Sequence, residues 1–153
     1  MTQFILYDSI EMDEPFMYEV YASTREEEMK AWGWGSQEQA AFLRMQYDAQ
    51  CRSYLSQYPS LGRKVIIYEN ERVGRLLTAL TGDGLTIVDI AILPNYRRRR
   101  IGTAILEQVC REAELFHIPI RLSVRYDNQA IRLYYRLGFK VVSRNEMTVF
   151  MEK

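Results

Sequence analysis

Hydrophobic and polar residues alternate along short segments, most clearly in the second half of the chain. In the segment 120–125, Ile120, Leu122 and Val124 alternate with Arg121, Ser123 and Arg125, which predicts a strand with one buried face. The segment 85–93 is almost continuously hydrophobic and ends at Pro94, which predicts a strand buried on both faces. By the same criteria, further strands are expected at 4–7, 65–68, 73–80, 139–143 and 147–151.

Other segments carry hydrophobic residues at the three- and four-residue spacing of helices. They predict helices over 13–29, 36–58 and 100–116, the second capped by Ser36 and the third ended before Pro119. A short helix is expected to be capped by Asp127 and to end at Gly138, where glycine can adopt a left-handed conformation. This order of elements predicts an α/β (α+β) fold, a mixed sheet with helices on its faces. The length favours a single domain over residues 1–153.

Charge and cysteine usage narrow the function classes. Twenty basic residues balance twenty acidic ones, which argues against a general nucleic-acid-binding protein. Cys51 and Cys110 are isolated and the chain has one histidine, so neither a metal site nor a disulfide framework is expected. No hydrophobic run has the length of a membrane span, and the N-terminus lacks a secretory pattern. The expected location is the cytoplasm, with no membrane partner.

Four consecutive arginines, Arg97 to Arg100, stand between the strand at 85–93 and the helix that follows. The first N–H groups of a helix have no internal partner and attract anions, and arginine side chains add charge that phosphates recognise. Gly102 allows close approach of a ligand to the backbone. A solvated basic turn and a module that binds nucleic acid or another anionic partner through Arg97–Arg100 are the alternatives.

The run Arg97-Arg-Arg-Arg-Ile-Gly102 resembles the pyrophosphate loop of the GNAT superfamily of N-acyltransferases, Arg/Gln-x-x-Gly-x-Gly/Ala, with Arg100 where glycine is usual. The segment from Asp127 to Phe139 resembles the same superfamily's Asn-x-x-Ala-x-x-Leu-Tyr-x-x-x-Gly-Phe signature, with Asp127 at the asparagine position and Asn128 next to it. The resemblance covers about Val65 to Phe139.

This resemblance implies a mostly antiparallel central sheet with helices on both faces and a parallel strand pair that splays apart between 87–93 and 120–124. It implies acetyl-CoA as the acyl donor and no metal. The backbone of Ile90, Ala91 and Ile92 would pair with the pantetheine arm. The residues expected to hold the rest of the cofactor are Arg97, Arg98, Arg99, Arg100, Ile101, Gly102, Thr103, Asp127 and Asn128.

The resemblance also implies catalytic roles. The backbone N–H of Ile90 would donate to the developing oxyanion, and Tyr134 would be the general acid that protonates the leaving thiolate. The alternative for Tyr134 is a core tyrosine. Asp89 is the candidate base, because it is the only ionisable residue in its hydrophobic strand; a structural ion pair is its alternative role.

Residues of the first half are candidates for the acceptor site. Glu26, Glu27 and Glu28 could attract a cationic amine or could be a solvated helix end. The aromatic residues that could line the pocket are Trp32, Trp34, Tyr47, Tyr54 and Tyr58.

The resemblance therefore implies an N-acetyltransferase that moves the acetyl group of acetyl-CoA to a primary amine by direct attack in a ternary complex. The acceptor would be a small-molecule or peptide amine, with no nucleic-acid partner, and family members often form homodimers. The alternative within the family is a catalytically silent CoA-binding or regulatory protein.

Overall fold

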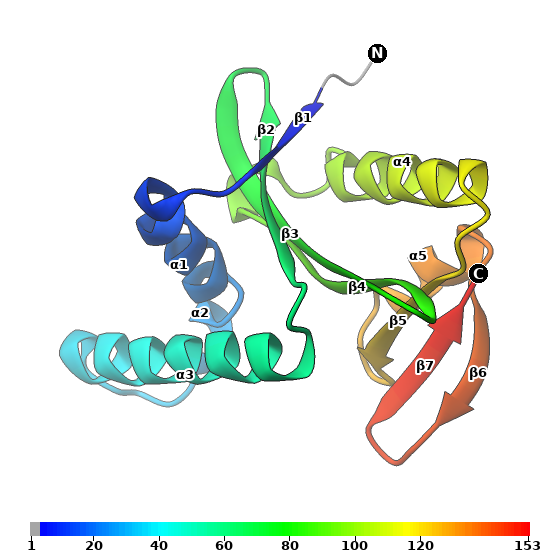
Figure 1. Ribbon diagram of the computed structural model, residues 1–153. Coiled ribbons are helices and arrows are strands. Elements are labelled where there is room, and N and C mark those ends of the chain that lie inside the picture. The colour runs from blue at the N-terminus through cyan, green and yellow to red at the C-terminus, as the bar shows by residue number, and fades with distance from the viewer. Residues whose placement is uncertain (1–3) are drawn as a thin grey trace.

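The computed structural model describes residues 4–153, which form one seven-stranded sheet flanked by helices (Figure 1). Neighbouring strands are antiparallel except for β4 and β5, which are parallel. The predicted mixed, mostly antiparallel sheet is thus confirmed. In spatial order the strands are β1 (Phe4–Asp8), β2 (Gly62–Tyr68), β3 (Glu71–Thr81), β4 (Gly84–Ile92), β5 (Ile120–Arg125), β7 (Thr148–Glu152) and β6 (Lys140–Arg144).

Helices cover both faces of the sheet, as expected. Alternation along β2 directs Ile66 toward the core beneath α4 (Ile101–Leu115) and α5 (Ile131–Arg136), and Val65 toward α1 (Glu14–Ser23). Helices α2 (Glu26–Lys30) and α3 (Ser36–Gln57) join α1 in a smaller core. Helices α1 to α3 lie beside the half of the sheet that contains β1 to β4, and β5 to β7 extend beyond them (Figure 1).

The single helix predicted over 13–29 is wrong, because the chain forms α1 and α2 with a break at Thr24 and Arg25. At this break the hydroxyl of Thr24 donates to the Tyr21 carbonyl at 2.7 Å. Such local side-chain bonds compete with the helical ladder. The helix predicted at 36 is found, but Gly35 is its N-cap and Ser36 is its first helical residue.

The segment before α5 also differs from the prediction. Asp127 caps no helix; its carboxylate is in an ion pair with Arg125 at 3.2 Å. The side chain of Asn128 accepts a hydrogen bond from the Ala130 N–H at 2.8 Å and starts the turn into α5. At the other end of α5, Gly138 has a φ of +97°, the left-handed conformation that the sequence predicts.

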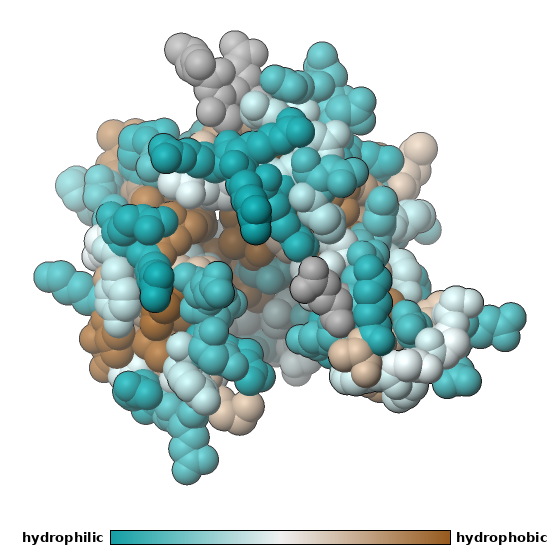
Figure 2. Space-filling model, turned by 180° about the vertical axis from the view of Figure 1, so that it is seen from behind, coloured by the Kyte–Doolittle hydropathy of each residue, from teal (hydrophilic) through white to brown (hydrophobic). Residues whose placement is uncertain are grey.

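The face turned away from the viewer in Figure 1 is hollowed near its centre. Hydrophobic surface lines the hollow and hydrophilic side chains surround it (Figure 2). No helix in the described part of the chain is long and hydrophobic enough to cross a membrane.

Candidate functional site

Strands β4 and β5 pair over three residues and then separate. Leu85, Thr86 and Ile87 are in register with Ile120, Arg121 and Leu122, and no pairing continues from Val88 onward. The expected splayed parallel pair is therefore present. Both strands keep unpaired backbone groups beyond this point, and such groups are available to a ligand.

A cavity of about 970 Å³ occupies the space between the separated strands. Its walls come from β4, β5, the start of α4, the turn into α5, and the C-terminal end of α3. The side chains and backbone that line it include Ile90, Ile92, Arg97, Gly102, Asn128 and Tyr134. With Asp89, seven of the predicted catalytic and cofactor-binding residues thus border one continuous space.

A β-bulge at Val88 changes which way β4 turns its backbone. Leu77 of β3 faces Asp89 and Thr78 faces Ile87, so Val88 has no partner on β3. Beyond the bulge, the Leu93 N–H donates to the Val73 carbonyl of β3. Because backbone N–H groups alternate between the two edges of a strand, the N–H of Ile90 turns away from β3, toward the cavity. The sequence gives no sign of this bulge.

The same alternation determines the directions of the backbone groups of Ile92 and Ala91. The Ile92 carbonyl turns to the cavity side and accepts a hydrogen bond from the Arg97 Nε at 2.9 Å. Ala91 turns its N–H to β3, and its side chain is buried on the α1 face. Of the three residues predicted to contact the pantetheine arm, Ile90 and Ile92 border the cavity and Ala91 does not.

The arginine run forms a loop that leads into the N-terminus of α4. The four arginines are exposed; Arg97 binds the Ile92 carbonyl, and the guanidinium of Arg99 stacks over the Tyr96 ring at 5.4 Å. Among the side chains that the structure describes, no carboxylate pairs with any of them. A second hollow of about 420 Å³ lies at this helix end, bordered by Arg97, Arg98, Arg100, Ile101, Gly102 and Thr103.

Arg100 is the N-cap of α4 and has a φ of 59° and a ψ of 21°. This left-handed conformation is one that glycine adopts without strain. The loop therefore has a glycine-like backbone at Arg100 although the side chain is present. At Gly102, an added Cβ would meet no protein atom within 4 Å, so the space in front of the first helical turn is open.

Tyr134 lies in α5 with its ring packed edge-on against Phe139, at 5.9 Å between centroids. The side chain is buried, yet its hydroxyl has no hydrogen-bond partner among the described residues and borders the cavity. Burial, and to a lesser extent the charge of Asp89, raises the pKa of this phenol. The hydroxyl thus keeps its proton at neutral pH and can donate it.

Asp89 also borders the cavity, and its carboxylate forms an ion pair. Its Oδ2 accepts from the Nε of Arg75 at 2.8 Å and lies 2.7 Å from the Nη2. Arg75 is buried and also donates to the Gln50 side chain at 3.2 Å. This is the structural ion pair that the sequence leaves open as the alternative to a base.

The C-terminal end of α3 contributes candidate acceptor-site residues to the cavity. Tyr54 and Tyr58, two of the aromatic candidates, border the cavity together with Gln57. The other three aromatic candidates do not border it. Tyr47 is buried between α1 and α3, and Trp32 and Trp34 pack against each other and against Phe42. Of the three candidate glutamates, Glu26 and Glu28 lie exposed on α2, and the side chain of Glu27 lies outside the part that the structure describes.

The sequence matches one known family over most of its length. A family model described as the acetyltransferase (GNAT) family matches residues 13–139. The chain belongs to this family. A curated relative, an N-alpha-acetyltransferase of Sulfurisphaera tokodaii, is 40% identical over 62 residues. That match covers 37% of this chain and 35% of the relative, so the matched part spans about a third of the relative's length.

Solved structures of GNAT proteins share the fold. The PaiA N-acetyltransferase of Thermoplasma acidophilum, solved in complex with coenzyme A, superimposes with a TM-score of 0.73 at 17% identity and covers 99% of this chain and 98% of its own. The ribosomal-protein-S18-alanine N-acetyltransferase of Escherichia coli has a TM-score of 0.65 at 21% identity, with 98% and 92% covered. The predicted GNAT resemblance and fold are confirmed.

Two positions distinguish this GNAT chain from the family motifs. Arg100 replaces a glycine but keeps a glycine-like backbone. At the asparagine position of the second motif stands Asp127, which does not border the cavity, whereas its neighbour Asn128 does. Within residues 4–153, no group of three or more histidine, cysteine and acidic side chains is arranged to hold a metal ion.

Proposed function

We propose that this protein is an acetyl-CoA-dependent N-acetyltransferase that acts on a primary amine. The observation that carries the proposal is the joining of two features in one cavity. A strand edge with unpaired backbone groups runs from the Val88 bulge to Ile92, and the N-terminus of α4 with its four arginines follows directly. Acetyl-CoA carries its thioester on a long arm that ends in a pyrophosphate. The arm can pair with a strand edge, and the pyrophosphate can bind at a helix N-terminus.

The donor would lie along β4 with its phosphates at the start of α4. The exposed guanidinium groups of Arg98 and Arg100 and the N–H groups of the first turn would hold the phosphates, since both donate to anions. The open space before Gly102 accommodates a phosphate close to the backbone. Ile90 and Ile92 would pair with the amides of the pantetheine arm, and Asn128 borders the same space.

The chemistry is attack of a neutral amine on the thioester carbonyl, followed by departure of the CoA thiolate. The N–H of Ile90 is proposed to stabilise the oxyanion, because the bulge directs it toward the cavity. Tyr134 is proposed to protonate the thiolate, since its phenol is protonated at neutral pH and borders the cavity. Phenol and backbone amide come from different elements and face the same space.

The acceptor is proposed to be the α-amine of a peptide. The sequence relative is named an N-alpha-acetyltransferase, which supports an α-amine, and one GNAT neighbour is named for a ribosomal-protein alanine. The acceptor would approach from the α3 side of the cavity, past Tyr54 and Tyr58, because the α4 side is taken by the donor.

The test is a mixture of the purified protein, acetyl-CoA and a panel of amines that includes short peptides with a free N-terminus. Released thiol gives the rate, and mass spectrometry identifies the acetylated product. We expect acetylated peptide and no product from the same peptide with a blocked N-terminus. Binding of acetyl-CoA without acetylation of any amine would contradict catalysis and favour the silent CoA-binding alternative.

A further inference from the structure

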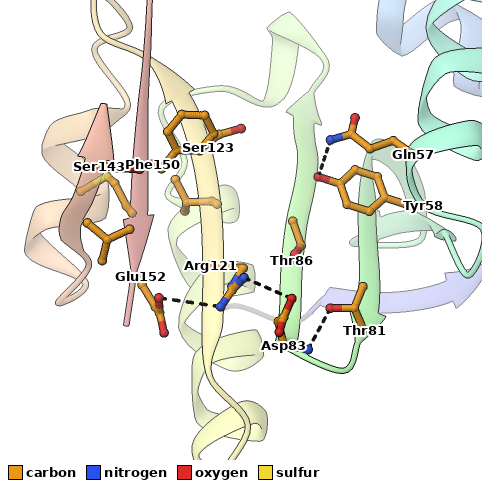
Figure 3. Close-up of a pocket in the computed structure, with 13 residues that line it drawn as sticks. Gln57, Tyr58, Thr81, Asp83, Thr86, Arg121, Ser123, Ser143, Phe150 and Glu152 are labelled. Carbon is orange, nitrogen blue, oxygen red and sulfur yellow. Dashed lines mark hydrogen bonds and ion pairs between the residues drawn. The ribbon is translucent and has the colours of Figure 1, made fainter. Parts of the chain in front are cut away.

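On the side away from α4, the cavity extends beyond the splayed strands into another hollow, of about 470 Å³. Figure 3 shows this hollow between the C-terminal end of α3 and the face of β5, β7 and β6 that α1 to α3 leave uncovered. The hollow and the cavity share five lining residues, so they form one continuous groove along β4 and β5. These residues are Gln57, Tyr58, Thr86, Leu122 and Ser123.

Arg121 lies in the floor of this hollow, between Asp83 at the β3–β4 turn and Glu152 of β7 (Figure 3). Its Nη1 is 3.9 Å from the Asp83 Oδ2 and its Nη2 is 3.9 Å from the Glu152 Oε2. Both distances are too long for hydrogen bonds. The Nε is buried and has no partner among the described residues.

The guanidinium of Arg121 therefore has charge partners but no hydrogen-bonded acceptor among the described residues. Its side chain is 39% exposed, so a ligand can reach it. A planar guanidinium presents a fork that matches a carboxylate, and charge-assisted bonds of this kind are shorter and stronger than neutral ones. Asp83 and Glu152 oppose an anionic ligand, but Asp83 is 81% exposed and well screened by solvent.

The pairing of β4 with β5 gives the distance between Arg121 and the proposed reaction centre at Ile90. Arg121 is opposite Thr86 of β4, four residues before Ile90. At about 3.3 Å per residue, the two positions are about 13 Å apart along the strand. Because residue five of an extended chain lies about 13 Å from residue one, a peptide with its α-amine at the thioester would bring the side chain of its fourth or fifth residue to Arg121.

We infer that Arg121 selects acceptor peptides that carry an acidic side chain at the fourth or fifth residue. The inference rests on the proposed peptide N-acetylation and adds a substrate class to it. Thr86, Ser123 and Tyr58 line the connecting groove with hydroxyl groups that can pair with the peptide backbone.

The experiment compares three tetrapeptide amides that differ only in the last residue, Ala-Ala-Ala-Glu, Ala-Ala-Ala-Gln and Ala-Ala-Ala-Arg. Each has a single amine, the N-terminal one. We expect kcat/KM for the glutamate peptide to exceed that for the glutamine peptide by about tenfold, a typical effect of one charge-assisted pair. In Arg121→Ala this ratio should fall to about one, and in Arg121→Glu the arginine peptide should become the best acceptor.

Arg111→Ala removes an exposed arginine of α4 that does not line this groove, and it should leave the ratio unchanged. Arg121→Lys retains the charge without the planar fork, so its ratio should lie between those of the wild type and Arg121→Ala. It also serves as the test if Arg121→Ala fails to fold. Equal rates for the three peptides, or a wild-type preference for the arginine peptide, would overturn the inference. Acetylation of non-peptide amines alone would overturn it and leave the proposed N-acetyltransferase standing, whereas failure to bind acetyl-CoA would overturn both.

Discussion

Arg75 and Asp89 form a partly buried ion pair directly after the bulge that turns the Ile90 N–H toward the cavity. Arg75 is 3% exposed and binds the carboxylate through two nitrogens, at 2.8 Å and 2.7 Å. The ring of Tyr21 lies 5.8 Å from its guanidinium, and Gln50 accepts a further hydrogen bond. The pair links β3 to β4 beneath the reaction centre, which favours a structural role for Asp89.

The Arg75–Asp89 pair should contribute to the stability of the fold. Arg75→Met and Asp89→Asn should each lower the free energy of unfolding, because each leaves a partly buried charge without its partner. In a double-mutant cycle the two effects should be non-additive by about 1–3 kcal/mol. Urea denaturation measures both. If Asp89→Asn instead left stability unchanged and abolished turnover, Asp89 would be the base.

Tyr134→Phe should lower turnover by roughly 10²–10⁴-fold, because it removes the proposed proton donor. The affinity for acetyl-CoA should stay nearly the same, since the ring and its contact with Phe139 remain. Tyr135→Phe is the control, since Tyr135 is 52% exposed and its ring does not border the cavity. Equal effects of the two substitutions on the rate of thiol release would remove Tyr134 from the mechanism.

Arg100→Gly should stabilise the fold by about 1 kcal/mol, because glycine relieves the left-handed strain at φ 59° at a smaller cost in chain entropy. Arg99→Gly is the matched control, since Arg99 does not have a positive φ and gains nothing from glycine. Chemical denaturation of the two variants gives the comparison. A loss of stability in Arg100→Gly as large as that in Arg99→Gly would contradict the strain.

Acid should weaken the fold through Asp13. The Ile10 N–H, and then Tyr7 and Arg72, donate hydrogen bonds to this buried carboxylate and lower its pKa. A lowered folded-state pKa gives stability that is fully present above the unfolded pKa of about 4 and is lost as the pH falls through the folded value.

Asp13→Asn should therefore destabilise the protein at pH 7 and reduce the loss of stability on going to lower pH. Asp8→Asn is the control at an exposed aspartate. Thermal unfolding of both variants between pH 3 and pH 7, a window chosen around about pH 4, measures the effect. Parallel pH profiles for wild type and Asp13→Asn would contradict this account.

Local pattern was sufficient for much of this fold. The alternation at 120–125 and the helical spacing at 100–116 each reflect a single buried face, and both elements form as the pattern predicts. The two cofactor motifs lie on consecutive elements around one strand, so their order along the chain brought their residues to the same cavity.

Other features depend on contacts that a sequence pattern does not contain. The bulge at Val88 lies in a strand that is hydrophobic on both faces, so a change of face leaves no trace in the pattern. Asp127 is as good a cap as Asn128 by type, and only the ion pair with Arg125 decides between them. The hollow around Arg121 combines α3, the β3–β4 turn and β7, which are far apart in sequence.

The most direct test of the central claim is a calorimetric titration of the protein with acetyl-CoA, with Gly102→Val as the matched variant. The wild type should bind with a micromolar or lower Kd, about 8 kcal/mol or more of binding free energy. Gly102→Val should keep its thermal stability to within about 1 kcal/mol and bind much more weakly, because the added Cβ lies in open space and the side chain would fill the phosphate space. No binding by the wild type, or equal binding by both proteins, would contradict the placement of acetyl-CoA between β4 and α4.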